Sequence, residues 1–485
     1  MKWNEILTYF FYDENNPILF HQGFFLFLFS CFLIGYSLVK KYEKSRFIFL
    51  AVFSLYFYYK ASGWSILLLL STIYFDYLIS FFIEKVKKEW HRKLVLFFGI
   101  SISLASLFYF KYKNFVLGNF NDWFGSSFQL EELILPIGIS FYTFQSISYM
   151  VDVYGKKVER PSFFKYLIYM IFFPHLVAGP IVRAKEFIPQ LDGNSQGSSK
   201  ENDEALGLIM KGFIKKAIIA DFVAQYSDIV FSEPSGFSGS EHFLASLCYS
   251  LQIFCDFSGY TDMAIGIALL LGYRLGLNFN SPYQARSITE FWRRWHISLS
   301  TWLRDYLYIP LGGNKKGFFL QLVFLLITML LGGFWHGADW KFIFWGVGHG
   351  LLLVAHKLWL KYFGDKKTIF SSGVLSIIIT FFLVNLLWIP FRVASIEDTL
   401  LIYQKIFTDF NVSKFFVAIE NNQLLFSILV FGYLGTLLSF SLKEKMVSFF
   451  SKQNLVLKFC FFIIIIQAFI QIQSEEVHPF IYFSF

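Results

Sequence analysis

Apolar runs long enough to cross a membrane alternate with short polar segments along most of this chain. A spanning helix needs roughly 17 to 25 apolar residues, and a count of such runs predicts about eleven transmembrane helices. We therefore expect an all-α polytopic membrane protein. The runs lie near residues 18–39, 47–59, 64–83, 94–110, 133–151, 163–176, 242–273, 317–355 (long enough for two spans), 373–391, 424–440 and 455–472.

Three stretches depart from a simple alternation of spans and loops. Residues 163–176 are apolar but end with Pro174-His175. Basic residues follow where the alternation of spans predicts an outer loop, which favours either a re-entrant segment or a local failure of the positive-inside rule. Residues 191–204 are rich in Gly, Ser and Asn, which is typical of a solvent loop. Residues 205–226 place lysines among apolar positions at helical spacing, which predicts an amphipathic interfacial helix.

The apolar run 242–273 is too long for one span, and residues 255–262 interrupt it with polar side chains. Two carboxylates in this segment, Asp256 and Asp262, would be costly in lipid. We therefore expect the segment to line the protein interior or a wet cavity. The alternative is a kinked helix whose acids are satisfied by neighbouring hydroxyl groups.

The composition supports the membrane assignment. Hydrophobic residues make up 56% of the chain and charged residues 16%, whereas a soluble domain carries roughly 25% charge. The net charge of +8 could suggest nucleic acid, but basic residues gather in short loops such as Lys40-Lys41 and Lys87-Lys88, as expected for cytoplasmic loops. We therefore exclude nucleic acid as a partner. The four cysteines lack CxxC spacing and predict neither a disulfide framework nor a zinc site.

We expect one continuous helical domain over residues 1–485, because spanning runs recur from end to end. Residues 1–160 would supply the N-terminal spans and residues 361–485 the C-terminal spans. Between them, residues 161–360 carry the motifs described next.

His336 is the first candidate catalytic residue. It follows the apolar run 318–331 and is bracketed by glycines, an expensive place for a polar ring unless the ring has a use. Histidine titrates near neutral pH and is the usual general base, so that His336 could take the proton of a hydroxyl attacking a thioester. The alternative is that residues 335–340 form only the turn between two spans.

Residues 291–308 form the second candidate stretch. Read as one helix, they place aromatic side chains at intervals of three or four residues, with charged residues towards both ends. Such a helix could lie at the membrane interface with its rings at headgroup depth. Alternatively, its arginines could hold an anionic group such as the phosphates of an acyl carrier. The residues concerned are Trp292, Arg293, Arg294, Trp295, Trp302, Arg304, Asp305 and Tyr306.

Other site chemistries lack their motifs. The chain has no HExxH, GxSxG or GxxxxGK[ST] sequence. His349 and His356 lie two helical turns apart, roughly 10 Å, which is too far to bind one ion side by side. We expect neither a metal nor a bound cofactor.

Six motifs resemble the membrane-bound O-acyltransferase (MBOAT) superfamily, and in particular its bacterial branch of alginate O-acetyltransferases. They occur in the family's order and span most of the chain. The matching segments are FPHLVAGPIVR at 173–183, DFSGYTD at 256–262, FWRRWH at 291–296, LRDYLYIPLGGN at 303–314, GFWHG at 333–337 and PFIYF at 479–483.

The resemblance implies a helical core around a central tunnel, in which His336 is the essential histidine and His296 the second histidine. It further implies acetyl-CoA as a cytosolic donor substrate, a bacterial inner-membrane location and acetyl transfer towards the periplasm. There, partner proteins would complete the O-acetylation of a polysaccharide such as alginate. The side chains expected to bind substrate are Trp292, Arg293, Arg294, Trp295, Arg304, Asp305 and Trp335.

Two other functions stay open. The first belongs to the same superfamily and is D-alanyl transfer from a carrier protein to teichoic acid. Residues 309–314 favour the alginate branch over this alternative. The second is a polysaccharide or lipid transporter without chemistry of its own. The chain shows no obvious internal repeat, which weighs against transporters built from repeated halves.

Overall fold

The computed structural model describes the chain except for residues 1–7, 15–16, 178, 194–197, 365–372 and 473–485, so that the PFIYF motif at 479–483 lies outside the described residues. All regular secondary structure in the described part is helical, which confirms the predicted all-α class. The chain divides into two compact units. Unit 1 comprises Met1–Leu206 and Met263–Gly276, and unit 2 comprises Gly207–Asp262 and Leu277–Phe485. The expected single domain stays a prediction.

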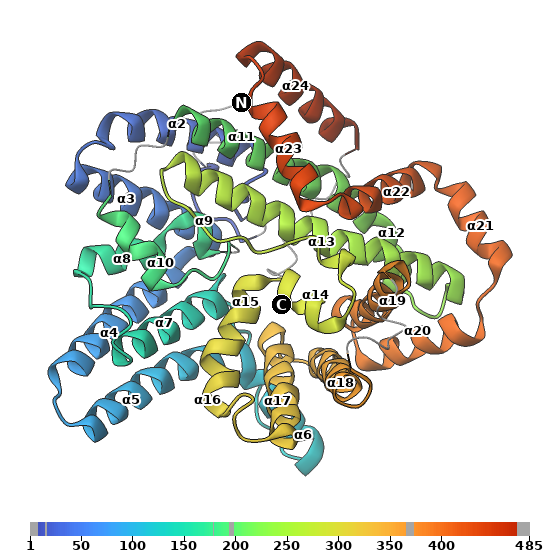
Figure 1. Cartoon of the computed structure of the whole chain (residues 1–485), viewed down its shortest axis with the longest axis horizontal. Coiled ribbons are helices and arrows are strands. Elements are labelled where there is room, and N and C mark those ends of the chain that lie inside the picture. The colour runs from blue at the N-terminus through green and yellow to red at the C-terminus, as the bar shows by residue number, and fades with distance from the viewer. Residues whose placement is uncertain (1–7, 15–16, 178, 194–197, 365–372, 473–485) are drawn as a thin grey trace. The chain divides into compact units, whose positions relative to one another are not determined.

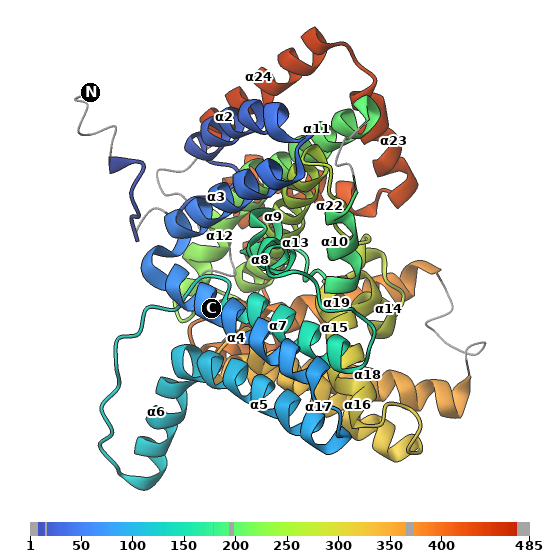
Figure 2. The same ribbon diagram turned by 90° about the vertical axis from the view of Figure 1, so that its left-hand side faces the viewer.

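Unit 1 is built around α4, α5 and α7, which pack side by side (Figure 2). Gly99 of α5 permits their close approach, because a Cβ atom there would lie 2.7 Å from both Ile79 of α4 and Met150 of α7. Its helices are α2 (Gly23–Val39), α3 (Glu43–Ser62), η1 (Gly63–Ser65), α4 (Ile66–Lys85), α5 (Glu89–Leu107), η2 (Phe108–Tyr112), α6 (Lys113–Phe124), α7 (Ile139–Tyr154), α8 (Phe163–Ile171), α9 (Phe173–Leu176) and α10 (Ala184–Leu191).

Unit 2 is built around the pair α17 and α18, with α19 packed against α18 (Figure 1). The elements from α11 onwards are α11 (Ser199–Phe213), η3 (Ile214–Ala220), α12 (Asp221–Ser232), α13 (Gly239–Leu270), η4 (Pro282–Gln284), α14 (Ile288–Arg294), α15 (Ile297–Leu303), η5 (Arg304–Tyr308), α16 (Ile309–Leu311), α17 (Phe318–His336), α18 (Trp340–Phe363), α19 (Gly373–Arg392), α20 (Ile396–Thr408), α21 (Val412–Asn421), α22 (Gln423–Leu437), α23 (Phe440–Ser451) and α24 (Leu455–Ile472).

Several helices are long and apolar enough to cross a membrane, which confirms a multi-pass membrane protein. Among the described residues six helices meet this test, or seven if the bent pair α21 and α22, which turn by 99°, forms one span. The predicted run 163–176 contains only the short helices α8 and α9. The six candidates are Glu43–Lys85, Glu89–Phe124, Gly239–Leu270, Phe318–His336, Trp340–Phe363 and Gly373–Arg392.

The structure confirms that residues 242–273 face the protein interior. Helix α13 runs unbroken from Gly239 to Leu270, and most of its apolar stretch is buried. The structure gives the two acids lysine partners, unlike the hydroxyl partners of the alternative. Lysines neutralise the two acids: Asp256 pairs with Lys216, and Asp262 with two further lysines. Paired in this way, both carboxylates are tolerated without breaking the helix.

Two expectations are corrected. The predicted helix 291–308 is broken between α14 and α15, for a reason given below. The predicted loop 191–204 ends in helix, since α11 begins at Ser199. Ser198 starts that helix with a reciprocal cap: its Oγ accepts a hydrogen bond from the Glu201 N–H, and Glu201 Oε2 accepts one from the Ser198 N–H at 2.7 Å.

Candidate active site

His336 is the last residue of α17, and two glycines pack α17 closely against α18 just before it. A Cβ atom at Gly333 would lie 2.3 Å from the carbonyl oxygen of Phe342 and 2.9 Å from the Cα of Gly346. The backbones of α17 and α18 therefore touch one turn before His336. Gly337 then leaves the helix in an extended conformation. Asp339 caps α18 by accepting a hydrogen bond from the Lys341 N–H at 2.9 Å.

Aromatic rings enclose the imidazole of His336, which is only 4% exposed. The ring centroids of Trp335 and Trp345 lie 4.9 Å from that of His336, and the centroid of Phe391 lies 5.0 Å from it. All three contacts are edge to face, the arrangement that aromatic quadrupoles favour. These contacts hold the imidazole in one orientation and exclude water from three of its sides.

His296 lies at the break between α14 and α15. Its backbone is left-handed (φ 41°, ψ 56°), a conformation that continues neither helix and is rare for residues other than glycine. Its side chain is fully buried and places Nδ1 3.2 Å from Oδ1 of Asn278. The Ser298 N–H also donates to that oxygen, at 3.1 Å. The strained backbone of His296 ends the predicted helix, and the side chain of the same residue makes the tertiary contact with Asn278.

The contact with Asn278 determines which nitrogen of His296 carries the proton. Because the backbone N–H of Ser298 can only donate, Oδ1 of Asn278 is an acceptor, and Nδ1 of His296 donates to it. Nε2 then keeps its lone pair. Burial lowers the pKa of His296 to about 3, so that the ring is neutral at physiological pH. His296 thus offers Nε2 as a hydrogen-bond acceptor.

Trp335 lies beside both histidines. Its ring centroid is 4.9 Å from that of His336 and 6.4 Å from that of His296. On another side of His296 lies Phe257 of α13, with a centroid distance of 4.7 Å. The two histidines predicted from separate motifs therefore belong to one aromatic cluster within unit 2, and a ring on the interior helix α13 contacts it.

A cavity of about 850 Å³ reaches the chain next to His336, at Gly337. Eight ionisable side chains line it, five of them acidic. Several are already paired: Arg392 Nε lies 2.9 Å from Asp228, and Lys216 lies 2.8 Å from Asp221. The ionisable lining residues are Lys216, Asp221, Asp228, Asp256, Asp339, Lys341, Arg392 and Asp398. A hydrophilic acceptor could therefore approach the aromatic cluster through a polar space.

The predicted substrate-binding tryptophans lie in the same aromatic region. Trp292 contacts Trp345 at a centroid distance of 5.7 Å, and Trp295 packs on Trp388 at 4.8 Å. Both indoles are buried. They hold α14 against α18 and α19, and through Trp345 they support the ring next to His336.

The predicted charged residues are placed differently. Arg294 pairs with Glu290 at 2.7 Å, and Arg304 pairs with its neighbour Asp305 at 2.8 Å. Arg293 is exposed. The structure thus gives two of the three arginines a carboxylate partner close by in the sequence. Their role in binding a donor stays a prediction.

Sequence reasoning missed three features of this site. Asn278 lies outside every motif, and only its contact with His296 reveals it. Arg392 and Asp228 line the cavity. The sequence feature that could have indicated this pair is the single arginine at the end of an apolar run. His349 is fully buried against Trp345 and Trp292, with centroid distances of 4.7 and 5.0 Å. Among the described residues, no group of three or more His, Cys, Asp or Glu side chains could hold a metal ion.

The comparisons with known proteins agree with this arrangement. The family model for the membrane-bound O-acyltransferases (MBOAT) matches residues 20–397, which include both histidines and most of the cavity. The peptidoglycan O-acetyltransferase of Helicobacter pylori is 38% identical over 79% of this chain and 78% of its own. The probable alginate O-acetylase AlgI of Pseudomonas aeruginosa is 39% identical over 81% of this chain and 75% of its own. The teichoic acid D-alanyltransferase of Streptococcus thermophilus is 31% identical over 49% and 60%.

The match covers well over half of the chain, and the relatives named for acetyl transfer align over about four fifths of it. An enzyme, and not a transporter without chemistry, therefore accounts for the buried histidines and the adjoining cavity. The chain belongs to the membrane-bound O-acyltransferase family and is an O-acyltransferase.

Proposed function

We propose that this protein passes an acetyl group from cytosolic acetyl-CoA across the membrane for the O-acetylation of an extracytoplasmic polysaccharide such as alginate. The observation that carries the proposal is the position of His336, which is buried among aromatic rings where a polar cavity reaches the chain. The names of the two relatives at 38% and 39% identity, a peptidoglycan O-acetyltransferase and a probable alginate O-acetylase, support acetyl as the transferred group.

The charges at the two ends of the α17–α18 pair support the direction of transfer. The end that carries Gly337 and the cavity has Lys341 and Arg392 balanced by several aspartates. The opposite end carries Lys315, Lys316, Lys357 and Lys361. By the positive-inside rule we infer that the basic end faces the cytoplasm and that the cavity opens on the acceptor side.

The chemistry needs a base, an aligned acceptor and the exclusion of water, because a thioester is already activated. In the proposed step, His336 removes the proton from the acceptor hydroxyl as its oxygen attacks the thioester carbonyl. The tetrahedral intermediate collapses, the carbon–sulfur bond breaks, and the protonated imidazole returns the proton to the leaving thiolate. The products are an O-acetyl ester and the free thiol. His296, through Nε2, positions the acceptor or shares the proton.

The acceptor hydroxyl belongs, in this proposal, to a periplasmic or membrane-anchored partner protein or to the polysaccharide itself. The peptidoglycan relative makes peptidoglycan the second candidate acceptor. D-Alanyl transfer from a carrier protein is a further alternative, supported by two teichoic acid D-alanyltransferases at 31% and 29% identity over about half of this chain. The higher identity and wider coverage of the acetyl-transfer relatives favour acetyl.

The test is transfer of radiolabelled acetyl from acetyl-CoA in inside-out membrane vesicles, which expose the cytoplasmic face to the donor. Vesicles would carry the wild type, His336→Ala, or His91→Ala as a matched control at an exposed histidine. At equal membrane levels, we expect label to reach a partner protein or glycan with the wild type and His91→Ala only. Full transfer by a folded His336→Ala protein would refute the assignment, and label in none of the three would favour a carrier-protein donor.

A further inference from the structure

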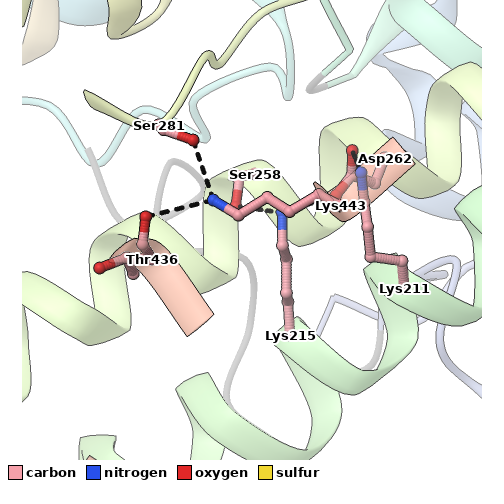
Figure 3. A network of polar contacts seen from close by, with 7 residues as sticks. All are labelled: Lys211, Lys215, Ser258, Asp262, Ser281, Thr436 and Lys443. Atoms are coloured by element: carbon pink, nitrogen blue, oxygen red, sulfur yellow. Dashed lines mark hydrogen bonds and ion pairs between the residues drawn. The ribbon is translucent and has the colours of Figure 1, made fainter. Parts of the chain in front are cut away.

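A second polar cluster of unit 2 lies on α13, one to two turns beyond Asp256. Asp262 receives two ammonium groups: Lys211 Nζ lies 2.9 Å from Oδ1, and Lys215 Nζ lies 2.7 Å from Oδ2 (Figure 3). Lys215 also donates to the hydroxyl of Ser258 at 3.1 Å. One carboxylate is therefore shared between two lysines that come from α11 and η3.

A third lysine, Lys443 of α23, joins the same cluster. Its Nζ donates to Oγ of Ser281 at 2.9 Å and to the carbonyl oxygen of Thr436 at 3.2 Å (Figure 3). Burial, followed by the positive charges of Lys215 and Lys211, lowers the pKa of Lys443 to about 8. Lys443 therefore lies within electrostatic range of both other lysines. We call Lys211, Lys215 and Lys443 the lysine cluster.

Positive charge exceeds negative charge in this cluster. Lys211 and Lys215 share one buried carboxylate, Asp262, which also lies in electrostatic range of Lys443. The other acid in electrostatic range of Lys211 is the exposed Glu444. Burial also lowers the pKa of Lys211. Like charges held together away from bulk water repel each other and are costly unless an anion joins them. An oxyanion with several acceptor oxygens fits three ammonium donors from three directions.

Along η3 and α13 the cluster lies within two residues of the cavity residues Lys216 and Asp256, but along α19 it is set back from the cavity. Ser281 precedes η4, and η4 packs on α19 through Tyr283 and Phe381, whose ring centroids are 5.1 Å apart. Phe381 lies 11 residues before Arg392 at the cavity, which corresponds to about 16 Å along α19. The anion would therefore come from the cytoplasmic side or from the lipid leaflet that faces it.

We propose that the lysine cluster binds a phosphate group, namely the phosphate-ester part of the cytosolic acyl donor. This rests on the proposed function. Helix α13 connects the cluster with the reaction centre, because Phe257 contacts His296 and the next residue, Ser258, accepts a hydrogen bond from Lys215. A donor held here by its phosphates could extend its acyl end along α13 towards the histidines. The headgroup of an anionic lipid offers the same chemistry from another source.

The experiment measures equilibrium binding of radiolabelled CoA to the full-length protein in phosphatidylcholine nanodiscs. The variants are Lys215→Gln and Lys443→Gln, with Lys445→Gln as a matched control because Lys445 is exposed on the same helix, two residues from Lys443. We expect Lys215→Gln and Lys443→Gln each to weaken CoA binding about tenfold, the loss of one charge-assisted contact. Lys445→Gln should bind as the wild type does, and Lys443→Arg should retain most of the affinity.

A second arm separates the two phosphate sources. Phosphatidylglycerol that stays bound to the purified protein is counted by native mass spectrometry for the same variants. Loss of the bound lipid without any change in CoA affinity would uphold a phosphate site but overturn its assignment to the donor. No change in either ligand, in variants with wild-type thermal stability, would overturn the site itself.

A third arm separates this proposal from the proposed function. We expect His336→Ala to bind CoA normally and to lose transfer. Normal CoA binding by the lysine-cluster variants would count only against the assignment of the cluster to the donor. Full transfer by His336→Ala would instead count against the catalytic assignment of that histidine.

Discussion

Gly333 of α17 and Gly346 of α18 meet backbone to backbone, one turn before His336. A Cβ atom at Gly346 would lie 2.5 Å from the carbonyl oxygen of Met329 and 3.0 Å from the Cα of Gly333. No side chain fits in that space without moving one of the two helices. The position of the candidate base therefore depends on two residues that have no side chain to take part in the chemistry.

We accordingly expect Gly346→Ala to lower the free energy of unfolding by about 1 to 3 kcal/mol, the usual cost of overpacking, and to lower transfer activity by displacing His336. Thermal unfolding in detergent and transfer in vesicles measure the two effects. Gly435→Ala in α22 is the control, because a Cβ atom there meets nothing within 4 Å. An undisturbed Gly346→Ala protein would contradict the close packing described here.

Asn278 is expected to act through His296. Asn278→Ala removes the acceptor for Nδ1 of His296 and for the N–H and hydroxyl groups of Ser298, which should lower the turnover number about tenfold. In a His296→Ala background the same substitution should have little further effect on turnover, since both residues would serve one function. Initial rates of the two single variants and the double variant test this. Independent, multiplicative losses would show that Asn278 acts elsewhere.

Acid should destabilise the protein through its buried histidines. The folded-state pKa of His296, about 3, lies below its ordinary value of 6.5. As the pH falls through 6.5, the unfolded chain binds the proton first, so that stability present at neutral pH is lost towards pH 3. The loss can reach about 1.4 kcal/mol per pH unit for one such group.

Thermal unfolding between pH 7.5 and 5.5 measures this effect. His296→Gln should flatten the pH dependence, whereas His91→Gln, at an exposed position, should leave it unchanged. Some slope should persist in His296→Gln, because burial also lowers the pKa of His175, to about 4. An unaltered slope in His296→Gln would indicate that the folded protein protonates His296 readily.

The ion pair between Arg392 and Asp228 should stabilise the wall of the cavity. Each side chain is about one third exposed or less, and Arg392 Nε lies 2.9 Å from Asp228. We expect Arg392→Met and Asp228→Leu each to destabilise the protein, and the double variant to be more stable than their sum predicts by about 0.5 to 3 kcal/mol. Unfolding temperatures of the four proteins in the cycle measure the coupling. Additive losses would mean that the pair contributes nothing as a pair.

Local sequence was sufficient for the fold class and drew attention to His336, whereas His296 was chosen through the family resemblance; the catalytic roles of both stay predictions. Apolar runs of spanning length predict helices because a lipid-exposed backbone must satisfy its own hydrogen bonds. His336 was identified by its position at the end of such a run, and the structure places it as the final residue of α17. The capping pair Ser198 and Glu201 was also readable in the sequence as an S-x-x-E pattern, although the stretch was interpreted as a loop.

The arginines show where local reading was insufficient. Their motif predicted free positive charge, but Glu290 and Asp305 lie close enough in sequence to pair with Arg294 and Arg304 on the same short helices. The unbalanced charge is found instead in the lysine cluster. Its members are Lys211, Lys215 and Lys443, the last more than 200 residues along the chain from the others.

The sequence by itself determined that this chain is a helical membrane protein with two prominent histidines, since spanning length and periodicity are local properties of the chain. Only the tertiary structure decided that α13 stays continuous past Asp262, that His296 breaks a helix where Asn278 binds it, and that a polar cavity ends beside His336. The reason is physical: ion pairs, strained backbone and cavities depend on groups brought together from distant segments, and no local pattern records those contacts.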